Sequence, residues 1–421
     1  MKYLLLAALL ALTLPTAAQD AAPKGPATLP PPRPYGAPRL VEGLPFETVP
    51  PEKADDHPLF AHQTRAPVHK TAPYQVTTIT DKLHLPWSLA FLPDGKFLVS
   101  EKYPGQLRIV APDGTLSAPL GGLSVLAGKL GLLDVVLAPD FKKSKRIYFA
   151  FFENLGPAYS NTCLAYGLLD QAGNAVHDVT VIYRGVPQIP ARNFNSKQGG
   201  RIAFAPDGSL FMTVGDRDDN IKADYDAALA QKTDNDVGKI IHLTPEGLPA
   251  ADNPRLPGWR PELWAIGIRS PEGLVFAPDG TLWETEHGPR GGDEVNIIKR
   301  GKNYGWPIIT HGIDYLGGQI GAGIVAKAGL EQPVYYWDPV IAPSGLAWYD
   351  GTLFAQWRGS LLAGALIELG VYRLKIAGHK VVAEEPLLTE LKTRIRDVRV
   401  GPDGAVYVLT EQHALLKLTP K

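Results

Sequence analysis

The sequence predicts an all-β protein, and three observations indicate a six-bladed β-propeller with a Pro-rich N-terminal extension. First, a turn centred on an aspartate, mostly as Pro-Asp-Gly, recurs between apolar runs at Asp94, Asp140, Asp207, Asp279, Asp350 and Asp403. Second, the copies lie about 62 residues apart on average, which exceeds a two-helix solenoid repeat and suits a four-stranded blade with long loops. Third, no helical period of comparable length interrupts them.

Each copy reads as a β-hairpin. In SLAFLPDGKFLVSE, around Asp94, the runs on both sides of the turn are mainly apolar, and Asp-Gly supplies the positive φ that a tight turn requires. Further strand-like segments follow most of the hairpins and end in turn residues. We predict outer strands in residues 105–114, 238–247, 293–301, 370–378 and 414–419.

The repeats account for nearly all of residues 74–421, which we interpret as one propeller domain. We expect the last strand to pair with a strand from the N-terminal side of this domain, because such closure removes the exposed edges of the sheets. The resulting prediction is six four-stranded blades with the six aspartates at equivalent turns.

Residues 1–18 have the pattern of a secretory signal peptide. Lys2 is followed by an apolar run over residues 3–14 and by small residues at 16–18. A membrane anchor is the alternative, but the run is too short to cross about 30 Å of hydrocarbon comfortably. We therefore expect a periplasmic or secreted protein without stable membrane insertion.

Residues 19–73 are rich in proline, lack a strand period and are predicted to form an extended linker around the edge of the propeller. His57, His62 and His69 lie in this segment. Three histidines can bind a metal ion, but without a second ligand pattern the favoured interpretation is polar residues in a loop.

The composition limits the partners and the fold. The chain has 42 basic and 43 acidic side chains, a net charge of −1, so no excess charge attracts nucleic acid or an anionic membrane. Hydrophobic residues make up 45%, enough for a sizeable core. Cys163 is the only cysteine, so no intramolecular disulfide can form, and its apolar neighbours predict that it is buried.

Polar residues end the second strand of several hairpins, and in a radial array these ends meet on one face around the channel. They are residues 100–101, 153–154, 215–218, 286–290 and 411. Several acids on one face suit a divalent cation or general acid–base catalysis, although polar residues end strands in many proteins. The loop 286–294, EHGPRGGDE, is more specific, because three glycines and a proline let backbone carbonyls approach a ligand or metal.

The motifs taken together resemble those of a known family. LPWSLAFLPDG, GLLDVVLAPDF, GGRIAFAPDG and IRSPEGL come before EHGPRGGDEVN and KNYGWP, and IAPSG and RIRDVRVGPDG come after them. This series, from about residue 85 to residue 419, is similar to the soluble quinoprotein aldose sugar dehydrogenases of the glucose/sorbosone dehydrogenase family. The resemblance implies a six-bladed propeller, the cofactor pyrroloquinoline quinone (PQQ) and a calcium ion that holds it. It also implies hydride transfer from C1 of an aldose sugar, which yields a lactone, and onward electron transfer to an unidentified acceptor.

The resemblance assigns residues to the cofactor. It implies that the carbonyls of Gly288 and Pro289 face the cofactor calcium. It places Arg394 and Arg396, in RIRD, against the cofactor carboxylates, for which the guanidinium fork is suited.

Roles for four further residues follow from the same resemblance. Arg269 matches an arginine over the quinone oxygens, where it could stabilise developing negative charge. Asp216 matches an aspartate that orients the catalytic base. Glu294 and Tyr304 match part of a second, structural calcium site.

Three positions depart from the family pattern. Lys197 stands where the family has its catalytic histidine, Lys129 where it has a cofactor-contacting glutamine, and Ser270 where it has an asparagine. A lysine with an ordinary pKa of about 10.4 is protonated at neutral pH, so Lys197 can act as a base only if burial beside another cation depresses its pKa. The two lysines could supply that repulsion, or they could bind an anionic ligand.

The sequence leaves three functions open. The first is a working PQQ-dependent dehydrogenase. The second is a propeller that binds a carbohydrate or an anion without turnover. The third is a calcium-dependent hydrolase of the lactonase type, because propellers host both chemistries and the fold alone does not decide between them.

Overall fold

The computed structural model describes residues 40–421 except 71–72, 104, 124–130, 155–158, 188, 191–196, 218–227 and 368–369. The regular secondary structure of the described chain is almost entirely β-strand, which confirms the predicted fold class. Its helices are short: α1 (Phe141–Ser144) and the 3-10 helices η2 (Leu229–Gln231), η3 (Ala355–Trp357) and η4 (Thr389–Leu391).

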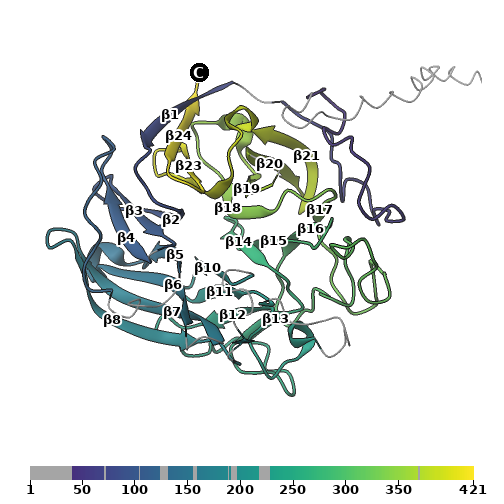
Figure 1. The fold of residues 1–421 in the computed structure, drawn as a ribbon, viewed down its shortest axis with the longest axis horizontal. Helices are drawn as coiled ribbons and strands as arrows, with labels where there is room; N and C mark the ends of the chain where they lie inside the picture. Colours follow the sequence, from purple (N-terminus) through teal and green to yellow (C-terminus); the bar gives the residue numbers. More distant parts are fainter. Residues whose placement is uncertain are drawn as a thin grey trace, which may run out of the picture.

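Six antiparallel sheets surround a central axis, as Figure 1 shows. The first sheet contains β2 (Pro86–Phe91), β3 (Phe97–Glu101) and β4 (Gln106–Val110). The second contains β5 (Leu132–Leu137), β6 (Arg146–Asn154), β7 (Tyr159–Asp170), β8 (Ala175–Arg184) and β9 (Ile189–Pro190). The third sheet contains β10 (Gly199–Phe204), β11 (Leu210–Val214), β12 (Lys239–Leu243) and β13 (Leu263–Ile266). The fourth contains β14 (Pro271–Phe276), β15 (Leu282–Glu286), β16 (Asp293–Ile297) and β17 (Tyr335–Trp337). The fifth sheet contains β18 (Pro343–Tyr349), β19 (Ser360–Ala365), β20 (Gly370–Ala377) and β21 (Lys380–Leu387). The sixth contains β22 (Ile395–Val400), β23 (Val406–Thr410), β24 (Leu415–Pro420) and β1 (Tyr74–Thr80).

The number of strands in a sheet varies around the ring. Four sheets have four strands each, but in the described part of the chain the first sheet has three and the second has five. The second sheet gains its fifth strand because β9 pairs with the end of β7. The number of blades is confirmed, and the second blade has the four predicted strands with β9 as an addition.

The ring closes as the sequence predicts. β1 pairs with the terminal strand β24 in an antiparallel register that runs from Tyr74 opposite Pro420 to Thr80 opposite Leu415. Figure 1 shows the purple β1 beside the yellow β24. The first strands of the six sheets contact one another in sequence around the axis, and β2 meets β22 to complete the circle.

All six repeated aspartates lie in the turn between the first and second strand of a sheet, which confirms their predicted equivalence. In the turn at Asp279, the carboxylate accepts a hydrogen bond from the Thr281 amide (2.9 Å), and Gly280 has a φ of +84°. The six turns thus face one end of the channel. The opposite ends of the same strands face the other end.

Hydrophobic side chains fill the spaces between neighbouring sheets. Cys163, as expected, is fully buried in the layer that also contains Phe149 and Phe151. Among the described helices, none has the length and hydrophobicity needed to span a bilayer.

Residues 40–70 pack against the outer edge of the fourth and fifth sheets. The amides of Glu52 and Lys53 donate to the Asp338 carboxylate (2.8 and 3.1 Å), and the Glu384 amide at the edge of β21 donates to the Pro67 carbonyl (2.9 Å). The three histidines of this segment are exposed. This part of the Pro-rich extension is held to the propeller by specific contacts.

Candidate active site

The candidate residues gather at the end of the channel opposite the aspartate turns. Lys197 precedes β10, Asp216 follows β11, Arg269 and Ser270 precede β14, Gly288 and Pro289 follow β15, Arg394 precedes β22, and Arg396 lies in it. Lys129 lies outside the described residues. First strands begin at this face and second strands end there, so residues far apart in the sequence meet.

Lys197 and Asp216 form an ion pair. The Lys197 Nζ lies 3.3 and 3.4 Å from the two carboxylate oxygens of Asp216, which is buried. The indole of Trp306 donates to the same carboxylate (2.8 Å), and the Asp216 amide donates to the Arg269 carbonyl (2.7 Å). The carboxylate therefore fixes the lysine that stands at the family's base position.

Arg269 links this pair to the glycine-rich loop. Its Nη1 donates to the carbonyls of His287 (2.8 Å) and Gly288 (2.6 Å), and its Nη2 donates to the Tyr315 hydroxyl (3.0 Å). The guanidinium carbon lies 5.0 Å from the centroid of the Trp306 ring. Among the described residues, the buried Arg269 Nε has no hydrogen-bond acceptor, so one donor remains for a ligand.

The loop around Gly288 is held rigidly. The Gly288 amide donates to the Asp293 carboxylate (2.7 Å), whose second oxygen accepts from the amides of Ile341 (2.7 Å) and Ala342 (2.6 Å). Burial raises the pKa of Asp293 to about 7, against the lowering effect of these hydrogen bonds. A Cβ atom on Gly288 would lie 2.2 Å from the Gly291 carbonyl oxygen, so the turn requires glycine here.

Two buried glutamates and the half-buried Glu294 surround one asparagine beside this loop. The Asn296 amide nitrogen lies within hydrogen-bond distance of Glu284 (3.1 Å), Glu286 (3.4 Å) and Glu294 (3.2 Å). Burial raises the pKa of Glu286 to about 7. Burial, and then repulsion by Glu286, raise the pKa values of Glu284 and Glu294 well above their ordinary range.

Tyr304 lies close to the glutamates, but its hydroxyl is already used. The hydroxyl donates to the Ile297 carbonyl (2.5 Å) and accepts from the Lys299 amide (2.8 Å), so only the main-chain carbonyl of Tyr304 can serve as a metal ligand. A small cavity joins this residue to Glu286, Gly288 and Glu294. In the described ranges, no three His, Cys, Asp or Glu side chains are arranged to hold one metal ion, so a calcium ion here needs backbone carbonyls as well.

The two arginines of RIRD share one carboxylate. Arg394 Nε lies 2.6 Å from Glu411, and Arg396 Nη2 also contacts Glu411. Arg396 Nη1 lies 3.5 Å from Glu272. Both arginines therefore lie at the predicted face, with acidic partners that the sequence did not reveal. Ser270 is buried, and its carbonyl accepts from the His287 amide (3.0 Å).

A buried ionic network lies deeper in the channel, and sequence reasoning missed it. Arg201 Nη1 lies 3.6 Å from Asp134 and 3.1 Å from Asp397, and Arg399 lies 2.8 Å from each of the same aspartates. The guanidinium of Arg201 also stacks over the Trp87 ring (3.9 Å). The only signal in the sequence was that three of these residues belong to the motifs GLLD, GGR and RIRD, which served as family markers.

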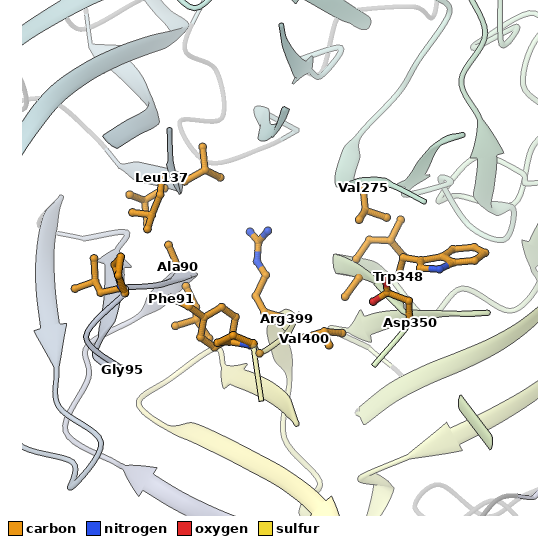
Figure 2. Close-up of a pocket in the computed structure, with 18 of the residues that line it drawn as sticks. Ala90, Phe91, Gly95, Leu137, Val275, Trp348, Asp350, Arg399 and Val400 are labelled. Atoms are coloured by element: carbon orange, nitrogen blue, oxygen red, sulfur yellow. The ribbon is translucent and has the colours of Figure 1, made fainter. Parts of the chain in front are cut away.

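A large cavity lies at the other end of the channel. It has a volume of about 830 Å³ and is lined mainly by apolar residues of the first strands and their turns. Figure 2 shows Arg399 extending into its centre, with Leu137 and Val275 on opposite sides. None of the candidate site residues lines this cavity, so the chemistry must be sought at the polar end.

Comparisons with known proteins identify the family of this chain. The profile of the Glucose / Sorbosone dehydrogenase family matches residues 83–417. Aldose sugar dehydrogenase YliI of Escherichia coli is 42% identical over 359 residues, which cover 83% of this chain and 94% of the relative. A crystal structure of the apo-form of the soluble E. coli aldose sugar dehydrogenase aligns with a TM-score of 0.75 at 40% identity, over 83% of this chain and all of that one.

A second solved structure contains the cofactor. The PQQ-bound form of the aldose sugar dehydrogenase from Streptomyces coelicolor aligns with a TM-score of 0.65 at 26% identity, over 84% of this chain and all of that one. The profile match covers most of the chain, and it includes every candidate site residue. The chain belongs to the glucose/sorbosone dehydrogenase family.

Proposed function

We propose that this protein is an exported quinoprotein dehydrogenase that oxidises the C1 hydroxyl of an aldose to the lactone with PQQ and calcium. The observation that carries this proposal is the cluster in which Lys197 pairs with Asp216 beside Arg269, whose guanidinium contacts the Gly288 carbonyl. The named activity of the E. coli relative and the PQQ in the S. coelicolor structure support it.

The residues present fit an anionic quinone. When bound, PQQ would supply a two-electron acceptor for hydride. Arg394 and Arg396 offer planar donor pairs for its carboxylates, and the buried Arg269 Nε has no acceptor in the described chain. Ser270 and Lys129 remain proposed cofactor contacts.

The first calcium ion would bind the carbonyls of Gly288 and Pro289. The Gly288 carbonyl now accepts from Arg269, so calcium binding would release this donor toward the quinone oxygens. The second ion would bind Glu294 and the Tyr304 carbonyl. The raised pKa values of the neighbouring glutamates support a cation there, because carboxylates crowded without water are stabilised by positive charge.

In this proposal Lys197 is the base. Its neutral amine takes the proton of the C1 hydroxyl as hydride leaves C1, and Asp216 then stabilises the ammonium that forms. Arg269 stabilises the negative charge that develops on the cofactor side of the transfer.

The same ion pair favours a second candidate function. A lysine that stays charged against Asp216 cannot accept a proton, and the site would then bind a carbohydrate or an anion without turnover. The lactonase alternative has no comparable support among the contacts of the described residues.

Reconstitution separates the two candidates. The purified apoprotein is loaded with PQQ and calcium, and the absorbance of the quinone is followed as aldoses are added. We expect reduction by the parent protein, and we expect Lys197→Met to abolish reduction while PQQ affinity changes little. If Lys197→His creates an activity that the parent lacks, the dehydrogenase proposal is wrong and the binding function is favoured.

Export is part of the proposal and has its own test. Residues 1–18 act as a signal peptide in this interpretation. N-terminal sequencing of the protein from a periplasmic or medium fraction should begin near residue 19. An intact Met1 on the mature protein would contradict export by this route.

A further inference from the structure

Lys102 is a half-buried lysine at the polar end of the channel, and the family resemblance assigned it no role. It directly follows β3, where its amide donates to the Leu85 carbonyl (2.9 Å) and its carbonyl accepts from the Leu132 amide (3.1 Å). Its Nζ lies 5.6 Å from the centroid of the Tyr103 ring and 6.0 Å from that of Phe152. The backbone and two aromatic rings therefore fix the position of the ammonium group.

The ammonium group lacks a carboxylate partner. Across the described residues, Lys102 Nζ takes part in no hydrogen bond or ion pair. The two acidic neighbours, Glu272 and Glu411, are both engaged by Arg396. Burial, and then repulsion by Arg396, lower the pKa of Lys102 to about 8.

The surroundings of Lys102 carry an excess of positive charge. Four cations face two carboxylates: Lys102, Arg217, Arg394 and Arg396 against Glu272 and Glu411. A cation that lies beside Arg396 with no carboxylate in direct contact costs free energy, and a bound anion between the two would remove this cost. The lysine ammonium has three donors and suits a carboxylate as a point charge.

We infer that Lys102 is a further ligand of the anionic cofactor and binds one PQQ carboxylate together with Arg396. This inference rests on the proposed function, because it takes PQQ as the anion. Lys102 acts only in binding and takes no part in proton or hydride transfer. Its contribution is therefore visible in the affinity of the apoprotein for PQQ, without any turnover.

Proton linkage gives a specific signature. At pH 8 the free apoprotein has Lys102 only partly protonated, and a carboxylate placed beside it favours the charged form. Binding of PQQ at this pH should therefore take up a fraction of a proton. The affinity should also fall as the pH rises above 8, because the neutral amine no longer attracts the carboxylate.

The experiment is calorimetric titration of PQQ into the calcium-loaded apoprotein at pH 8, in two buffers of different ionisation enthalpy. We expect Lys102→Met to weaken binding by roughly tenfold to a hundredfold, the range for one lost charge-assisted hydrogen bond, and to lose the proton uptake. Lys102→Arg should keep most of the affinity but also lose the uptake, because arginine does not titrate in this range. Lys142→Met, at the opposite end of the channel, is the matched control.

Proton uptake on binding could also come from Glu272 or Glu411. The variant Lys102→Arg distinguishes these sources, because it leaves both carboxylates in place and removes only the group that titrates at position 102. If Lys102→Met and Lys102→Arg bind PQQ with parental affinity and parental proton uptake, the inference is wrong while the proposed function stands. If the parent protein shows no binding of PQQ at all, the proposed function fails and the inference fails with it.

Discussion

The two ends of the propeller channel are built by the same six hairpins, yet they differ in almost every physical property. The turn end is apolar around Arg399, and its turns are stabilised by local hydrogen bonds such as that between Asp279 and the Thr281 amide. The other end concentrates charged groups that pair within one sheet, as Lys197 and Asp216 do, and between sheets, as Arg396 of β22 and Glu272 of β14 do.

This difference indicates that the turn of each repeat specifies the fold, whereas the strand ends at the polar face specify the chemistry. A turn stabilised by contacts two residues apart forms the same way in every blade. The strand ends at the polar face carry different side chains in each blade, so one site arises from unlike contributions of several blades. The ionic network of Arg201, Arg399 and two aspartates separates the two ends.

The largest effect on stability is expected in the ionic network that lies between the two ends of the channel. Asp134→Ala would leave the buried guanidinium of Arg201 and the half-buried one of Arg399 with one carboxylate fewer, and breaking a buried pair in this way costs about 3–5 kcal/mol. Asp140→Ala, at the exposed turn of the same hairpin, is the control. Denaturant unfolding measures both variants. Equal losses in the two would show that the network does not stabilise the channel.

Sequence reasoning recovered the turn end because its determinants are local. Asp-Gly between two apolar runs indicates a tight turn whatever lies elsewhere in the chain. The number of blades and the closure of the ring by β1 were therefore predictable. The fifth strand of the second sheet was not predictable, because β9 has only two residues and pairs through the distant end of β7.

The polar end was predictable only as a set of positions. The second strands' ends pointed to Asp216, and the resemblance pointed to Arg269 and Gly288. The sequence did not reveal that Arg396 shares Glu411 with Arg394, contacts Glu272 of the fourth sheet and has Lys102 of the first sheet nearby, because these contacts join residues far apart along the chain. Pairing between distant strand ends leaves no periodic signal in the sequence.

An intermediate effect on stability is expected for Lys102, at the polar end of the channel. A residue whose charge serves ligand binding should reduce the stability of the apoprotein. We expect Lys102→Met to raise the free energy of unfolding by roughly 1–2 kcal/mol at pH 7, since the folded protein no longer holds a partly desolvated cation beside Arg396. Lys142→Met, at the turn end, should change little.

The pH dependence of that gain has a definite sign. The pKa of Lys102 is about 8 in the folded protein and has its ordinary value of 10.5 in the unfolded chain. Below pH 8 both states are charged and the folded state bears the full penalty. Between pH 8 and 10.5 the folded state loses its proton first, so the parent protein regains stability and the advantage of methionine disappears. An advantage that stayed constant over this range would point to packing in place of charge.

The smallest effect is expected at the turn end. Asp279→Ala removes the hydrogen bond from the Thr281 amide (2.9 Å) but keeps Gly280 and its positive φ, so the hairpin should lose only about 0.5–1 kcal/mol. PQQ affinity should not change, because the channel and the ionic network lie between this turn and the polar end. Thermal unfolding and PQQ titration of the same preparation measure both quantities. A weakened PQQ affinity with a normal melting temperature would mean that the two ends are coupled, and the separation argued from the Arg201–Asp134 network would have to be abandoned.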